Sequence, residues 1–325
     1  MNVVYASNDG YARHLAVSLY SLLEHNEEAD KIHVYILSMG LSEENKNRLI
    51  GIGAQFEREV MVIELGDLKE RFSYKVDTGG FDLSIMARLF VGEVLPEAEE
   101  RVLYLDCDTV INASLKRLWE MDLGSNMVGA VMEPTIYPAV KESIGLLPED
   151  PYFNSGVLLI DLKRWRKELA QKLLLDFYSS RGGKLFAGDQ DTINGALKGR
   201  IKPLPPRYNF FTNYRYFHYS HLTKLSPVYQ TITKKSFQEA KKHPVILHYM
   251  GDERPWKQGN LNHYRKVYDH YLSQTPWAGT KKEEGSYLYM VIYHLMDYAT
   301  FLCPPIRDMV SRHFGMKVIN SRKGS

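Results

Sequence analysis

The chain has 325 residues, of which 44% are hydrophobic and 25% are charged, and its formal net charge is +2 at neutral pH. This length and composition predict a soluble protein with one large domain, or one domain plus an extension, and a sizeable core. The near balance of charge argues against nucleic acid as the partner, and the two cysteines, Cys107 and Cys303, form no metal-ligand pattern.

Strands and helices are predicted to alternate through the first half of the chain. Apolar runs predict buried strands over residues 3–6, 32–37, 60–65 and 102–105. Apolar residues at helical spacing predict helices over residues 11–23, 42–52 and 84–95. This order predicts an α/β fold, in which a mostly parallel sheet carries helices on both faces.

The second half of the chain is less regular. It contains predicted strands over residues 127–132, 157–160 and 245–247, and predicted helices over residues 162–178 and 191–197. Between them, residues 203–229 are rich in Pro, Tyr, Phe and Asn and are predicted to be a long irregular segment. Loops of this length in a compact domain are usually functional or mobile.

The C-terminal part differs in character, so we expect a domain over residues 1–275 and a helical, basic and aromatic extension over residues 276–325. Residues 287–302 are strongly apolar but are borderline short for a transmembrane helix. Residues 306–325 then carry five Lys or Arg against one Asp, with an apolar stripe at Ile306, Met309, Val310 and Phe314. An interfacial helix on an anionic membrane (residues 285–325) and a helix packed on the domain explain this pattern equally well.

The strand predicted at residues 102–105 ends in Asp106-Cys107-Asp108. Open α/β sheets bind their ligands beyond the carboxyl ends of the strands. Because residues two apart on a strand face opposite sides, the chain must turn at Cys107 if both carboxylates are to share one ion. Two oxygen ligands suit Mg²⁺ or Mn²⁺, and such an ion can hold a diphosphate. Taken alone, this tripeptide is more often a solvated turn or cap.

Four further segments place polar residues beside predicted elements. They are Ala6-Ser7-Asn8-Asp9, Phe153-Asn154-Ser155-Gly156, Gly188-Asp189-Gln190-Asp191 and His248-Tyr249-Met250-Gly251. Each has an ordinary structural explanation as a turn, a bulge, a helix cap or a hydrogen-bonded histidine. The functional interpretation is that His248 supplies a third metal ligand, and that Gly251, Arg254 and Lys257 approach phosphate oxygens.

Together and in this order, these motifs resemble glycosyltransferase family 8, which includes glycogenin and the bacterial lipooligosaccharide α-galactosyltransferases. The resemblance covers residues 2–272. It implies a single Rossmann-like nucleotide-diphospho-sugar transferase domain of the GT-A type, with a mostly parallel mixed sheet. It also implies a UDP-sugar donor, Mn²⁺ as cofactor with Mg²⁺ as the alternative, and retention of the anomeric configuration.

The resemblance also implies a role for each site residue. Asp106, Asp108 and His248 would ligate the metal, and Gln190, Asp189 and Asn154 would act at the donor sugar, with Gln190 near the anomeric carbon. The other implied donor-binding residues are Ala6, Ser7, Asp9, Tyr11, Arg88, Cys107, Ser155, Gly251, Arg254 and Lys257. Two departures stand out, because Asn8 and Arg254 occupy positions where the family usually has Asp and Lys. Arginine keeps the charge and can bind phosphate bidentately.

We therefore expect an enzyme that moves glucose or galactose from a UDP-sugar to a hydroxyl of a glycan, glycolipid or glycoprotein, forming an α-glycoside. The first residues have neither the basic segment nor the apolar run of a secretory signal, which favours the cytoplasm or the inner face of the membrane. The sequence indicates no oligomeric state.

Three alternatives stay open. Residues 106–110 also fit the motif of a haloacid dehalogenase-type phosphatase with Asp106 as nucleophile, but that fold places its motif near the N-terminus and gives Asn154 and His248 no role. A sugar-nucleotide pyrophosphorylase would need a glycine-rich basic loop after the first strand, which this chain lacks. The third alternative is a non-catalytic, membrane-associated protein that binds sugar nucleotides.

Overall fold

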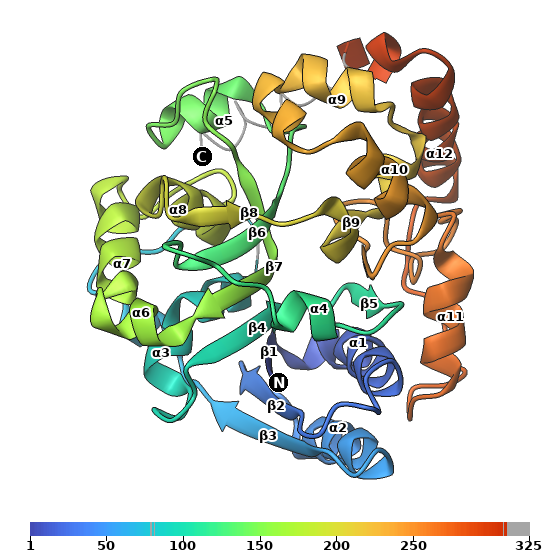
Figure 1. The fold of residues 1–325 in the computed structure, drawn as a ribbon. Coiled ribbons are helices and arrows are strands. Elements are labelled where there is room, and N and C mark those ends of the chain that lie inside the picture. Colours follow the sequence, from blue (N-terminus) through green and yellow to red (C-terminus); the bar gives the residue numbers. More distant parts are fainter. Residues whose placement is uncertain (79, 81, 308, 311–325) are drawn as a thin grey trace.

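Figure 1 shows the fold in a computed structural model, which describes residues 1–78, 80, 82–307 and 309–310. Within these residues, a seven-stranded mixed sheet has the order β3-β2-β1-β4-β7-β6-β8. Its strands are β1 (Asn2–Ser7), β2 (His33–Ser38), β3 (Glu59–Glu64), β4 (Arg101–Leu105), β6 (Val128–Met132), β7 (Phe153–Asp161) and β8 (Ile201–Pro203). Only β7 runs antiparallel to its neighbours in this sheet. The predicted α/β class with a mostly parallel mixed sheet is confirmed.

Helices cover both faces of the sheet (Figure 1). One side carries α1 (Ala12–Glu24), α2 (Glu43–Gln55) and α11 (Arg265–Ser273), and the other carries α3 (Val91–Val94), α6 (Leu162–Lys167), α7 (Ala170–Ser180) and α8 (Gly188–Ala196). The central strands are buried on both faces and therefore read as continuous apolar runs, such as Val102 to Leu105, each at most 2% exposed.

A second, three-stranded sheet has the order β5-β10-β9 and contributes directly to the site. Its strands are β5 (Thr109–Ile111), β10 (Ile246–His248) and β9 (Phe210–Phe211). β5 and β10 are antiparallel, with His248 opposite Thr109. This register carries the end of β10 to the turn that follows β4.

Two sequence predictions about helices need correction. The helix predicted over residues 162–178 is two helices, because Leu169 adopts a left-handed conformation (φ 53°) between α6 and α7. The segment predicted to be helical over residues 84–95 is a 3-10 helix, η3 (Leu83–Phe90), followed by the single turn α3.

The segment over residues 203–229 is not irregular, which corrects a third prediction. It holds β9 and the short helices η4 (Pro206–Tyr208), η5 (Thr212–Tyr216), α9 (Tyr219–Leu225) and η6 (Pro227–Thr231). Its aromatic side chains, such as Phe210 and Tyr214, are buried in the core. The remaining helices are η1 (Asp9–Tyr11), η2 (Leu68–Arg71), α4 (Lys116–Trp119), α5 (Pro138–Ser143) and α10 (Lys234–Lys242).

The C-terminal helix α12 (Tyr287–Leu302) lies at the edge of the molecule (Figure 1). It buries a stripe at helical spacing, Met290, His294, Asp297 and Thr300, and leaves large apolar side chains exposed on its other faces. None of the helices in the described residues is long and apolar enough to span a membrane. Of the apolar stripe predicted after α12, Ile306 and Met309 are exposed, while Phe314 lies outside the described residues.

Candidate functional site

The turn after β4 brings two carboxylates to one side of the chain. β4 ends at Leu105, and the carbonyl oxygen of Asp106 accepts hydrogen bonds from the Thr109 backbone N–H (3.2 Å) and hydroxyl (2.7 Å). This turn reverses the chain into β5 and buries Cys107, whose thiol donates to the Ala6 carbonyl oxygen (3.2 Å). The turn at Cys107 that a shared ion requires is therefore present.

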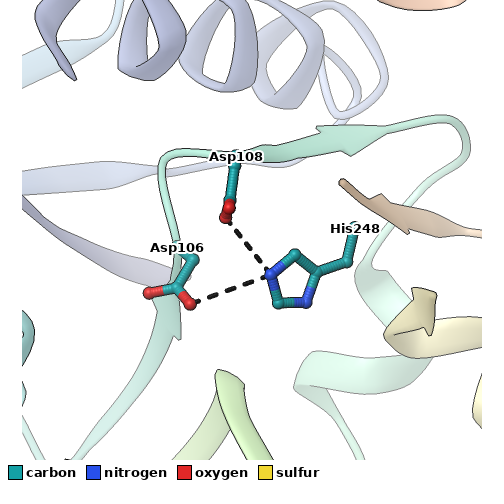
Figure 2. A group of neighbouring side chains, drawn as sticks. All are labelled: Asp106, Asp108 and His248. Atoms are coloured by element: carbon teal, nitrogen blue, oxygen red, sulfur yellow. Dashed lines mark ion pairs between the residues drawn. The ribbon is translucent and has the colours of Figure 1, made fainter. Parts of the chain in front are cut away.

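His248 completes a group of three candidate ligands (Figure 2). Its Nε2 lies 3.2 Å from Asp108 Oδ1 and 3.9 Å from Asp106 Oδ2, and one ligand atom from each residue lies within 4.8 Å of the others. Its Nδ1 donates to Asn209 Oδ1 (2.8 Å), which leaves Nε2 facing the carboxylates. A histidine oriented through its second nitrogen, together with two carboxylates, fits a divalent cation.

His248 and Asp108 influence each other's ionisation. Burial alone would lower the pKa of His248, but the neighbouring Asp108 carboxylate raises it. Burial would likewise raise the pKa of Asp108, and the His248 imidazolium holds it below its usual value. The Asp108 carboxylate and His248 Nε2 thus favour each other's charged forms, and the same nitrogen in its neutral form would bind a dication.

Gly156 is required by this geometry. It lies within β7, next to β4, and its backbone carbonyl accepts a hydrogen bond from the Asp106 N–H (2.8 Å). A Cβ at this position would lie 2.4 Å from His248 Cε1 and 2.7 Å from Asp106 Oδ2. The register between β6 and β7 shifts across this segment, which agrees with the bulge expected from the sequence, and the glycine also leaves space for the ligand group.

Arg88 joins the ligand group to the start of α8. Its guanidinium donates to Asp106 Oδ1 (2.8 Å) through Nη2 and lies 3.1 Å from Asp189 Oδ2 through Nε. Its Nη1 also donates to the Ser155 carbonyl oxygen (2.7 Å). Burial raises the pKa of Asp189 to about 6, although Arg88 opposes this shift. Arg88 is only 4% exposed, so its buried positive charge holds the Asp106 and Asp189 carboxylates in place.

The side chain of Gln190 is held in one orientation. Its carbonyl oxygen accepts from Asn154 Nδ2 (2.9 Å) and the Ser155 N–H (3.1 Å), and its amide nitrogen donates to Glu133 Oε2 (3.2 Å). Asn154 also accepts from Asn209 Nδ2 (2.8 Å), so the network continues to His248. Glu133 was not predicted, although it directly follows the strand predicted at residues 127–132, the position at which α/β sheets place ligand-binding residues.

These side chains line one cavity of about 370 Å³. It contains most of the residues that the sequence analysis named, from several elements: Ala6, Ser7, Tyr11, Arg88, Asp106, Cys107, Asp108, Asn154, Ser155, Asp189, Gln190, His248, Gly251 and Arg254. It also contains residues that were not predicted, among them Asp82, Tyr104, Glu133 and Phe186.

Asp9 and Lys257 are not part of the cavity lining. The Asp9 carboxylate accepts from the Ser42 N–H and from Asn45 Nδ2 (both 2.8 Å), so it holds the start of α2. Lys257 forms a β-bridge with Glu283. Arg254 does line the cavity, and its Nε is buried without a hydrogen-bond partner among the described residues. It is therefore available to an anionic ligand.

Comparisons with known proteins identify the family of this chain. The family model "Glycosyl transferase family 8" matches residues 2–259. General stress protein A of Bacillus subtilis is 27% identical over 85% of this chain and 94% of its own length. The lipopolysaccharide 1,2-glucosyltransferase of Escherichia coli is 25% identical over 85% of this chain and 79% of its own length.

A solved structure is similar as well. The galactosyltransferase LgtC, in complex with donor and acceptor sugar analogs, superposes with a TM-score of 0.72 at 26% identity, covering 85% of this chain and 96% of that one. The α/β sheet, the cavity at its strand ends and the family match over most of the chain lead to one conclusion. The chain belongs to glycosyltransferase family 8.

Proposed function

We propose that the protein is a metal-dependent, retaining hexosyltransferase that moves glucose or galactose from a UDP-sugar to an acceptor hydroxyl. The observation that carries this proposal is the group of Asp106, Asp108 and His248 at the end of β4, within a cavity that Arg88 and Arg254 also line. The similar LgtC structure holds donor and acceptor sugar analogs, and the E. coli relative is named a glucosyltransferase. Family membership leaves the phosphatase and pyrophosphorylase interpretations without support.

The proposed cofactor is Mn²⁺, held by Asp106, Asp108 and His248, with Mg²⁺ as the alternative. One imidazole among the ligands favours Mn²⁺, because Mg²⁺ strongly prefers oxygen ligands. When bound, the ion neutralises the diphosphate as a Lewis acid. Arg254 would add a second positive charge to the leaving diphosphate, and Lys257 would assist from outside the cavity lining. Ala6, Ser7 and Tyr11 would line the uridine end, and Asp9 would act there only indirectly, through the start of α2.

The mechanism we propose is attack from the same face as the leaving group. The bond between the anomeric carbon and the phosphate oxygen breaks, the acceptor oxygen bonds to that carbon, and the acceptor proton passes to the leaving phosphate. A double displacement would need a free nucleophile at the sugar. Asp189 is engaged by Arg88 and by the Ser155 hydroxyl (2.8 Å), and the Gln190 carbonyl already accepts two hydrogen bonds. Both side chains are therefore better suited to orienting the sugar.

Product analysis tests this reaction. UDP-glucose and UDP-galactose are incubated with Mn²⁺ and glycan acceptors, released UDP is measured, and the new linkage is assigned by NMR. An α-glycoside supports the proposal, a β-glycoside contradicts retention, and donor binding without turnover indicates a non-catalytic binder. A glycosyl adduct trapped on Asp189 would contradict same-face attack.

The acceptor we propose is a glycan carried by the cell envelope or by a protein, reached from the inner face of an anionic membrane. The support is the exposed apolar face of α12, which includes Leu288 (71% exposed), Ile292 and Leu295 (61%), followed by the basic residues of the C-terminal sequence. Sedimentation with vesicles tests this proposal. We expect the protein to bind anionic phosphatidylglycerol vesicles at low salt and to be released at about 1 M salt, because that ionic strength screens the contacts between charges. Equal partition with neutral and anionic vesicles would contradict it.

A further inference from the structure

We infer that α12 is a positioning element for the donor site. It holds the segment of residues 250–257, here called the donor loop, through a buried polar cluster of Glu253, His294, Asp297 and Arg307. The inference rests on the proposed function, because the donor loop contributes Gly251 and Arg254 to the cavity.

The cluster joins α12 to the donor loop in the interior of the protein. Glu253, His294 and Asp297 are 1%, 4% and 0% exposed, and one polar atom from each lies within 4.8 Å of the others. His294 Nδ1 is 2.9 Å from Asp297 Oδ2, and Arg307 Nη1 donates to Asp297 Oδ1 (2.7 Å). Two carboxyl groups thus face one guanidinium and one imidazole in the interior of the protein.

Glu253 also anchors the cluster to the domain. Its carboxylate accepts hydrogen bonds from Asn262 Nδ2 and from the Thr212 hydroxyl (3.4 Å). Its other oxygen, Oε1, and His294 Nε2 are buried with no hydrogen-bond partner in the part of the chain that the structure describes. Since Glu253 directly precedes Arg254, a Glu253 carboxylate held in place restrains the backbone next to this arginine. Separating the buried Asp297 carboxylate from Arg307 would be strongly unfavourable, so the cluster favours one position of α12 against the domain.

Contacts outside the cluster hold the rest of the donor loop. The Tyr289 hydroxyl donates to Asp252 Oδ2 (2.8 Å), at the N-terminal turn of α12. Glu283 donates its N–H to the Trp256 carbonyl oxygen (2.8 Å) and accepts from the Gln258 N–H (2.9 Å) through its own carbonyl. The donor loop from Asp252 to Trp256, and Gln258 just after it, are thus held by residues that are remote in sequence from the metal ligands.

One consequence concerns the proposed membrane contact. The exposed apolar side chains of α12 and its buried polar stripe lie on the same helix of 16 residues. Membrane contact at the exposed apolar face would therefore stabilise α12 in the position in which its buried polar stripe holds the donor loop. In the terms of a two-state equilibrium, the donor binds only the fraction of molecules in which the loop is in place, and its apparent affinity falls with that fraction.

Two variants test the inference. Tyr289→Phe removes one surface hydroxyl, and Asp297→Asn removes one buried charge. Tyr74→Phe is the matched control, since it deletes a hydroxyl that donates to the Leu175 carbonyl oxygen (2.9 Å) on another part of the protein. The first measurement is hydrogen–deuterium exchange without ligand, followed over residues 250–262. We expect both α12 variants to speed exchange in this segment and the control to leave it unchanged.

The second measurement is titration of UDP in the presence of Mn²⁺, with donor KM and kcat for turnover. We expect about tenfold weaker UDP binding in Asp297→Asn and a higher donor KM at nearly constant kcat, because saturating donor restores the competent state. Unchanged exchange in both variants, or UDP affinities within about twofold of the parent, would overturn the inference. If the unmodified protein binds no UDP, the proposed function fails, while the exchange data still decide whether α12 holds the donor loop.

Discussion

Replacing Arg88 by Met removes the charge that holds Asp106 and Asp189 together. Arg88 and the Asp189 side chain are 4% and 6% exposed, and the Asp106 side chain is 23% exposed. Methionine fills much of the same volume but pairs with neither carboxylate. Because breaking a buried ion pair from one side leaves an uncompensated charge, we expect a loss of about 3–5 kcal/mol of unfolding free energy. This corresponds to a decrease of about 5–8 °C in melting temperature for a domain of this size.

The double variant Arg88→Met, Asp189→Asn separates the charge effect from lost packing. If the cost arises from the unpaired buried carboxylate, neutralising Asp189 should restore about 2 kcal/mol in the Arg88→Met background, although it destabilises the unmodified protein. Urea unfolding followed by circular dichroism gives all four free energies. A loss below about 1 kcal/mol for Arg88→Met, or no recovery in the double variant, would refute the reasoning.

Two further predictions concern the ligand group and the α12 cluster. Gly156→Ala should weaken Mn²⁺-dependent UDP binding at least about tenfold, because the new Cβ would displace His248 and Asp106. The control is Gly51→Ala, where nothing lies within 4 Å of the added Cβ, and this variant should bind UDP as the parent does. Calorimetric titration checks both variants, and normal affinity in Gly156→Ala would contradict the site geometry. Burial, together with the nearby Asp297 carboxylate, raises the pKa of Glu253 to about 7, although His294 and Arg307 oppose this shift. Because this pKa lies above the unfolded value, the contribution of Glu253 to stability is complete below the unfolded pKa and is lost as the pH rises through about 7. The melting temperature of the parent relative to Glu253→Gln should therefore fall between about pH 5 and about pH 8, and a constant or rising difference would show that this carboxyl is ionised throughout.

The parts of the fold that were predictable share one property: their signal is local. β1, β2 and β4 are continuous apolar runs, because strands buried on both faces need apolar residues at every position. Leu169 shows the opposite case. Nothing in its side chain favours a left-handed conformation, so helix propensity alone predicts one continuous helix where the structure has a break between α6 and α7.

The site was predictable in its residue types but not in its assembly. Asp106 and Asp108 follow a recognisable strand, whereas the approach of His248 depends on the pairing of β5 with β10, two three-residue strands that are distant in sequence. Strands this short carry no periodicity from which a register can be read. Likewise, His294 and Asp297 stand out within an apolar segment of the sequence, but their partner Glu253 is identified only by the fold.

The most direct test of the central claim is calorimetric titration of UDP into the protein with and without Mn²⁺, beside a variant carrying Asp106→Asn and Asp108→Asn. These substitutions keep the shape of the side chains and remove the negative charge of the ligand group. We expect UDP binding that requires Mn²⁺ and is lost in the variant, and a comparison of UDP-glucose with UDP-galactose then identifies the donor. Binding that is independent of both the metal and the two aspartates, or no binding at all, would contradict a metal-dependent nucleotide-sugar site.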